Sequence, residues 1–199
     1  MFQKMLSKAF TTTIIIGLIM SLTAVLAGAD TPVGGFIRQD TTWMADDSPY
    51  EMIASIIVEE GITLTIEPNV TVKVAGQYAL QIKGGLVARG TETKPIIFTA
   101  KNSTTPGSWG YIKFEDSSMD AEFIVGEYVS GLILQYCTVE YAGGSGASGA
   151  VWADSASPFI DNCVIRQNAK SGLYLNDSAS VISNNKISGN NTNGGAGGE

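Results

Sequence analysis

Three aspartates recur at similar places in the second half of the chain. Asp116, Asp154 and Asp177 each follow a short apolar alternation and each precede a serine. If they stack on neighbouring strands, they offer oxygen ligands to Ca²⁺ or raise one another's pKa for acid–base catalysis. The alternative is that each carboxylate opens a turn by hydrogen-bonding the backbone two residues on. We favour turn chemistry and keep the three as candidate catalytic or Ca²⁺-binding residues.

The elements that must position these carboxylates come from a near repeat. Residues 148–168 (SGAVWADSASPFIDNCVIRQN) are followed by residues 171–190 (SGLYLNDSASVISNNKISGN). Matching the identical letters gives an offset of 23 residues, which falls to 22 after Pro158. A period in the low twenties predicts a solenoid, because one turn cannot bury its apolar face until a neighbour stacks on it.

Short stretches in the body of the chain place apolar residues two apart, between Gly, Asn and Pro turn signals. This period predicts half-buried strands. We therefore expect an all-β fold, a right-handed parallel β-helix of about five coils over residues 41–191, without a long helix. Stacking the coils predicts three inward columns: Phe114, Trp152 and Leu175; Leu134, Ile160 and Ile182; and Val139, Ile165 and Ile187, extended by Phe98.

The ends of the chain differ from this body. Residues 1–27 have Lys4 and Lys8 before an apolar run and small residues, which predicts a signal peptide and a secreted or cell-surface protein. A retained anchor is the alternative, although the run is shorter than the ~20 residues of a span. Residues 28–40 are expected to form a linker or cap. Residues 192–199 are a Gly/Asn tail, expected to be a flexible linker.

Charge and composition narrow the function. The chain has a net charge of −7, which becomes 10 − 19 = −9 without Lys4 and Lys8, and it has no cluster of basic residues, so nucleic acid is not an expected partner. It contains no histidine. Ser-His-Asp and Cys-His sites and His-ligated zinc centres are therefore excluded.

The first half of the body resembles a known family. The phrases GITLTIEPN, GGLVARGT, PIIFTA and WGYIKF occur in that order between residues 61 and 114. They resemble the N-terminal module of secreted right-handed parallel β-helix proteins of the pectate lyase-like superfamily. Asn69 replaces the usual Gly, Ala100 a Ser and Tyr111 a Gly. The resemblance implies the fold but not the activity, because the family includes enzymes, adhesins and surface proteins.

A polysaccharide lyase-like site would also need a basic residue beside the carboxylates. Arg166 is expected to point outward beside Glu140 of the preceding coil, as a cross-strand ion pair rather than a base. Cys137 and Cys163 share a column; we favour free buried thiols, with a disulfide between adjacent coils as the alternative.

Four tyrosines belong to the long third coil: Tyr111, Tyr128, Tyr136 and Tyr141. Exposed aromatic rings can stack on sugars, so these tyrosines are candidate carbohydrate-binding residues. The alternative is that they are scattered surface tyrosines without a binding role. Residues 119–129 are inserted in the same coil and are expected to leave it as a loop. The sequence thus predicts a structural, adhesive or carbohydrate-binding module, with a lyase or hydrolase of acidic polysaccharide as the alternative.

Overall fold

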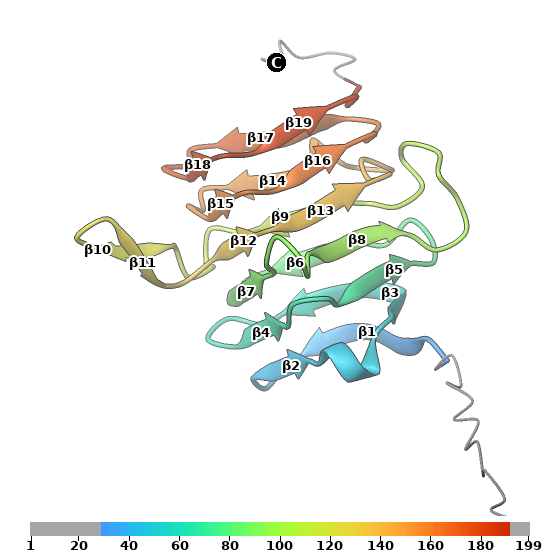
Figure 1. Cartoon of the computed structure of the whole chain (residues 1–199), viewed down its shortest axis with the longest axis horizontal. Coiled ribbons are helices and arrows are strands. Elements are labelled where there is room, and N and C mark those ends of the chain that lie inside the picture. Colours follow the sequence, from blue (N-terminus) through green and yellow to red (C-terminus); the bar gives the residue numbers. More distant parts are fainter. Residues whose placement is uncertain (1–28, 192–199) are drawn as a thin grey trace, which may run out of the picture.

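The computed structural model describes residues 29–191, which wind into a parallel β-helix rising from β1 and β2 to β17, β18 and β19 (Figure 1). One sheet has eleven strands, in the order β17-β14-β9-β6-β3-β5-β8-β13-β16-β19, with β1 also paired to β3. Its strands are β1 (Thr31–Ile37), β3 (Tyr50–Val58), β5 (Thr71–Val74), β6 (Leu80–Ile82), β8 (Ile96–Ala100), β9 (Ile112–Phe114), β13 (Cys137–Glu140), β14 (Gly149–Asp154), β16 (Val164–Arg166), β17 (Ser171–Asn176) and β19 (Lys186–Ser188).

A second sheet closes the coil. Its six strands follow the order β18-β15-β12-β7-β4-β2, one from each successive coil. They are β2 (Thr41–Trp43), β4 (Thr63–Ile66), β7 (Gly85–Arg89), β12 (Ile133–Gln135), β15 (Phe159–Asp161) and β18 (Val181–Ser183). A 3₁₀ helix, η1 (Ala45–Asp47), is the single helical element in the described part of the chain.

The predicted fold class is confirmed, because consecutive coils pair through parallel strands. The expected number of about five coils is too low, since the second sheet alone has a strand from each of six. Residues 28–40, expected as a linker or cap, contain β1, which pairs with β3 along the first coil. The predicted signal peptide and tail lie outside the described residues. Within 29–191, no helix is long and apolar enough to cross a bilayer.

Inward side chains form the core of the coil. Two predicted columns are confirmed by the strand register: Leu134, Ile160 and Ile182; and Phe98, Val139, Ile165 and Ile187. The chain turns between sheets at residues with left-handed φ, and these stack as well, with Asn162 (φ 52°) and Asn184 (φ 54°) at the same corner. The coils containing β12, β15 and β18 therefore repeat both the buried strand residues and the backbone geometry of the corner at Tyr136, Asn162 and Asn184.

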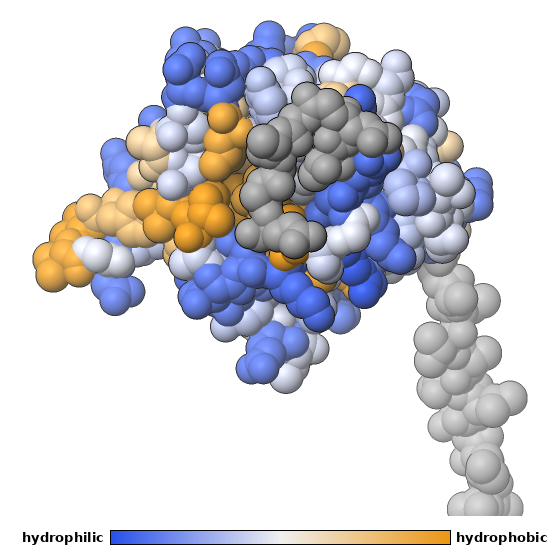
Figure 2. Space-filling model, turned by 90° about the horizontal axis from the view of Figure 1, so that it is seen from above, coloured by the Kyte–Doolittle hydropathy of each residue, from blue (hydrophilic) through white to orange (hydrophobic). Residues whose placement is uncertain are grey.

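The third coil carries the expected insertion as a hairpin. β10 (Glu122–Ile124) pairs antiparallel with β11 (Glu127–Ser130), and together they project from the coil (Figure 1). Figure 2 shows this projection as a concentration of apolar surface, which includes Ile124 and Val125. Val125 is 98% exposed.

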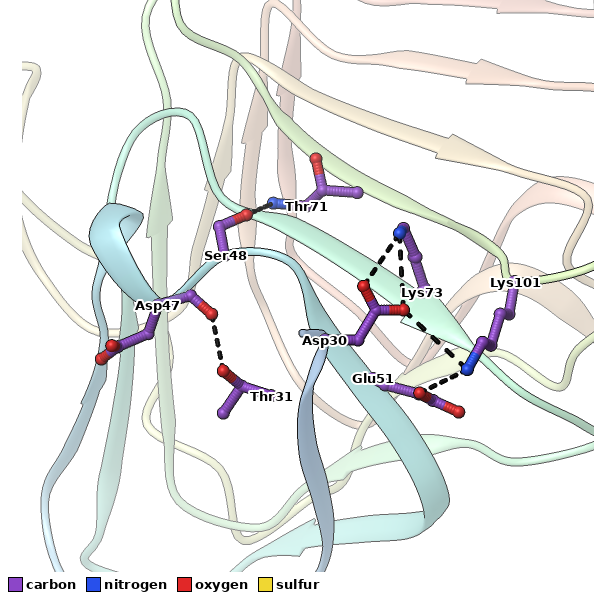
Figure 3. Close-up of polar contacts among 8 residues, drawn as sticks. All are labelled: Asp30, Thr31, Asp47, Ser48, Glu51, Thr71, Lys73 and Lys101. Carbon is purple, nitrogen blue, oxygen red and sulfur yellow. Dashed lines mark hydrogen bonds and ion pairs between the residues drawn. The ribbon is translucent and has the colours of Figure 1, made fainter. Parts of the chain in front are cut away.

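Ion pairs connect Asp30, just before β1, to neighbouring strands of the coil. The carboxylate of Asp30 pairs with Lys73 on β5 at 3.1 Å and with Lys101 at 3.9 Å (Figure 3). Lys101 also pairs with Glu51 on β3. Because partly exposed pairs stabilise a protein little, this network positions β1 more than it stabilises the fold.

One buried carboxylate joins three coils. Asp161, at the end of β15, is 6% exposed. It accepts hydrogen bonds from the side chains of Gln135 (2.9 Å), Asn162 (2.7 Å), Ser183 (2.7 Å) and Asn184 (3.0 Å). Burial would raise the pKa of Asp161, but these four donors outweigh it and hold the pKa below its usual value of 3.8.

We expect Asp161→Ala to lower the free energy of unfolding by about 2–3 kcal/mol, because it leaves several donors without an acceptor. The carboxylate stabilises the fold fully above about pH 3.8, and this contribution is lost as the pH falls through its lower folded pKa. Denaturant unfolding at neutral and acidic pH measures both effects. Asp116→Ala, at an exposed position, is the matched control; equal losses in the two variants would contradict the role of Asp161.

Candidate functional site

The structure corrects the register of the second half of the chain. β14 pairs with β17 at a constant offset of 22 residues, as from Gly149 to Ser171. Ala153, and not Trp152, therefore lies between Phe114 and Leu175. The predicted column containing Trp152 is wrong, and this tryptophan is on the outer face of the coil.

The predicted register was wrong because the two repeats were aligned on their identical turn residues. Matching the DSAS segments at 154–157 and 177–180 shifts β14 by one residue, and a one-residue slip turns every side chain of a strand to the other face. The left-handed corner is a better guide: Ser155 has φ 54° and Asp177 has φ 47°. Asp177 thus corresponds to Ser155.

The three candidate aspartates consequently do not stack. Asp154 pairs with Asn176 on β17, whereas Asp177 lies one residue further on, in an exposed turn. Asp116 is also exposed, two residues past the end of β9. Nowhere in residues 29–191 do three or more acidic or cysteine side chains gather in a way that could hold a metal ion.

The corrected register brings three aromatic rings together on the outer face of β9, β14 and β17. The ring centroid of Trp152 lies 5.7 Å from that of Tyr111 and 6.0 Å from that of Tyr174. Tyr174 meets Trp152 at an interplanar angle of 89° and is 41% exposed. Tyr174 therefore offers the open ring, and Trp152 supports it edge-to-face.

Trp152 carries an unusual polar feature. Its Nε1 is buried and has no hydrogen-bond partner in the described structure. Buried donors are nearly always satisfied in folded proteins, so an unpaired indole N–H beside an open ring invites an explanation in terms of function. An acceptor from a ligand or from water would remove the cost, of about 1–3 kcal/mol, of leaving it unpaired.

A charged group borders the rings. Lys113 Nζ lies 4.1 Å from the centroid of the Trp152 ring, 2.9 Å from Glu115 and 3.0 Å from Asp154. Asp154 also accepts a hydrogen bond of 3.1 Å from Asn176. The cation is thus paired twice and also contacts the aromatic face.

These contacts determine the protonation states of Lys113 and Asp154. Burial alone would lower the pKa of Lys113, but the hydrogen bonds and charges of Glu115 and Asp154 outweigh it and raise that pKa. The hydrogen bonds from Lys113 and Asn176 lower the pKa of Asp154. Lys113 therefore stays protonated and Asp154 stays ionised at neutral pH, so neither is suited to exchange a proton with a substrate.

The other predicted tyrosines lie apart from this face. Tyr128 belongs to the hairpin, where its ring lies 6.0 Å from Phe159 and under Arg89. Tyr136 and Tyr141 occupy left-handed corners, with φ of 49° and 61°. The structure therefore brings only Tyr111 of the four predicted tyrosines into the aromatic group.

The predicted ion pair between neighbouring coils is confirmed. Arg166 donates two hydrogen bonds to Glu140 Oε2, at 3.0 and 2.8 Å. Glu140 Oε1 accepts a third from Thr99. This pair joins β8, β13 and β16, and the aromatic face lies on other strands.

Comparisons with known proteins agree with the architecture. Residues 35–116 match the family described as a pectate-lyase like beta helix domain. The Drosophila melanogaster protein called Protein bark beetle is 39% identical over 71 residues, which are 36% of this chain and 2% of that protein. No solved structure matches the chain.

The chain is therefore a parallel β-helix in which residues 35–116 match a pectate-lyase like beta helix domain, and further coils through β19 continue that segment. It spans only a small fraction of the curated relative that it matches, so the relative's activity does not transfer to it. The aromatic face uses β14 and β17, which follow the matched segment.

Sequence reasoning missed Lys113, Glu115, Trp152 and Tyr174 as members of one face. Their signal was present in the alternation of Ile112 and Phe114 inward with Lys113 outward. Applying the same alternation to β14 places Trp152 outward.

We expect truncation of Trp109 to destabilise the fold more than truncation of Trp152. Trp109 is fully buried and donates a 2.8 Å hydrogen bond to the Glu140 carbonyl, so Trp109→Ala should cost about 3–5 kcal/mol. Trp152→Ala, on the outer face, should cost about 1 kcal/mol. Urea unfolding of both variants compares them. A larger loss for Trp152 would contradict the outward assignment.

Proposed function

We propose that the protein is a secreted or cell-surface β-helix module that binds carbohydrate without cleaving it. The binding surface is the outer face of β9, β14 and β17, defined by Tyr111, Lys113, Trp152, Asp154 and Tyr174. The observation that carries this proposal is the open Tyr174 ring supported by Trp152, because aromatic rings are the common platforms for the apolar faces of sugars.

Polar groups beside the ring suit sugar hydroxyls. Asp154 offers carboxylate oxygens as acceptors, and Asn176 has an amide that donates and accepts. Successive strands lie ~4.8 Å apart, so the face repeats on the scale of a sugar ring along the coil.

The charges favour a neutral glycan over an acidic one. Lys113 is one cation against the two carboxylates of Glu115 and Asp154, and its ammonium is occupied by both. A uronic acid polymer would approach this net negative group against repulsion. The enzyme alternative is disfavoured for a related reason, because Lys113, the basic residue of the face, is held protonated and cannot act as a base.

Calorimetric titration with neutral oligosaccharides and with oligogalacturonate tests the proposal. We expect saturable binding of a neutral glycan and no unsaturated sugar ends after prolonged incubation with polygalacturonate. Tyr174→Ala should weaken binding by about tenfold, whereas Tyr174→Phe, which keeps the ring, should retain it.

The hairpin tyrosine provides the matched control. Tyr128→Ala removes a ring of the same type from the β10–β11 hairpin, away from the aromatic face, and should leave the affinity unchanged. If Tyr128→Ala abolishes binding while Tyr174→Ala does not, the site lies on the hairpin and the assignment to β9, β14 and β17 is wrong. Absence of binding to every neutral glycan would reject the carbohydrate function itself.

A further inference from the structure

Two cysteines meet across neighbouring coils, away from the aromatic face. Thr138 on β13 pairs with Val164 on β16, so the residues before them, Cys137 and Cys163, lie opposite each other. Both are 1% exposed and both are free thiols in the structure. The Cys137 N–H donates to Cys163 Sγ at 3.4 Å, which shows how closely the second thiol approaches the first coil.

A groove reaches this pair from outside. It has a volume of about 310 Å³, and Cys137 and Cys163 are among its lining residues. Glu92 and Lys186, both exposed, and Tyr136 also line it. The groove therefore lies on the outside of the two cysteines, while their side chains belong to the core and are 1% exposed, so an oxidant in the groove reaches the sulfurs only when this corner opens locally.

We propose that Cys137 and Cys163 are an oxidisable pair that closes a disulfide across two coils when local opening of the corner beside this groove admits a small disulfide oxidant. Residues directly opposite each other on parallel strands lie ~4.8 Å apart, which is inside the Cα separation of about 4.4–6.8 Å that disulfides allow. The Cα separation of the pair is thus compatible with the bond.

The two thiols differ in their surroundings. The neighbouring Cys137 side chain and the Cys137 N–H, which donates to Cys163 Sγ, lower the pKa of Cys163. Burial raises the pKa of Cys137 well above its usual value. Asp161 is a nearby charge and opposes ionisation of Cys163, but the hydrogen bonds outweigh it. The Cys137 N–H is aimed at Cys163 Sγ and would stabilise a thiolate there, so we assign Cys163 as the attacking thiol.

The reaction balances as two exchanges. Cys163 Sγ attacks one sulfur of the oxidant, forms a mixed disulfide and releases the first thiolate. Cys137 loses its proton to that thiolate and attacks Cys163 Sγ, which expels the second thiolate, and the proton from Cys163 neutralises it. Two protein thiols are oxidised to one disulfide, and the oxidant is reduced to two thiols.

Oxidised glutathione is the probe for the experiment. The reduced, folded full chain is incubated with it at neutral pH, then unfolded and alkylated, and its intact mass is measured. We expect a monomer that has lost two hydrogens and takes up no alkylating reagent. Its Tm should rise by about 5–10 °C, reversibly with reductant, because the bond closes a loop in the unfolded chain. Two alkylated cysteines after prolonged incubation, or a disulfide between two molecules, would overturn the proposal.

Single variants test the order of attack. Cys137→Ala should stop the reaction at the mixed disulfide and give a glutathione adduct on Cys163. In Cys163→Ala the remaining thiol is buried and protonated, so its adduct should form at least about tenfold more slowly. Equal rates in the two variants would overturn the assignment of Cys163 as the attacking thiol. The Tm of each reduced variant shows that the comparison is made on folded protein.

Discussion

Every part of this molecule depends on the stacking of one coil on the next. A single coil of three short strands has no partner for its inward side chains, and its backbone groups are paired only when a neighbouring strand lies above or below. The parallel register is therefore the constraint from which the core, the corners and the outer face all follow. Asp161 expresses it in one residue, since its four donors come from three coils.

The outer face follows from this register. Trp152 is brought beside Tyr174 and Lys113 because β9, β14 and β17 pair directly, residue against residue. The inward side chains fix the strands in the core, and the outward rings and Lys113 pack on one another across these strands. Such a surface is prepared for a ligand before it binds, and this reduces the loss of side-chain entropy on binding.

The fold was predictable because its signals are local and repeated. Columns such as Leu134, Ile160 and Ile182 were found correctly, since each of these aliphatic residues lies two residues before a corner, at Tyr136, Asn162 and Asn184. The predicted column containing Trp152 was wrong because it was aligned on identical residues in turns. The alternation of apolar residues is the better guide to register, because the core requires it. The ion pairs of Lys113 were not predicted, because they depend on how far long side chains reach between neighbouring strands. The sequence period predicts the face on which a residue lies but not its ionic partners.

The tip of the β10–β11 hairpin is a position at which the coil can accept inserted sequence. Its tip at Val125 and Gly126 has left-handed φ at both residues, and the two strands satisfy each other's backbone outside the coil. New sequence entering there would meet solvent on nearly every side, since Val125 is 98% exposed. The tip is accordingly a position at which recombination or an engineer could exchange a recognition peptide while the rungs on either side keep their alignment.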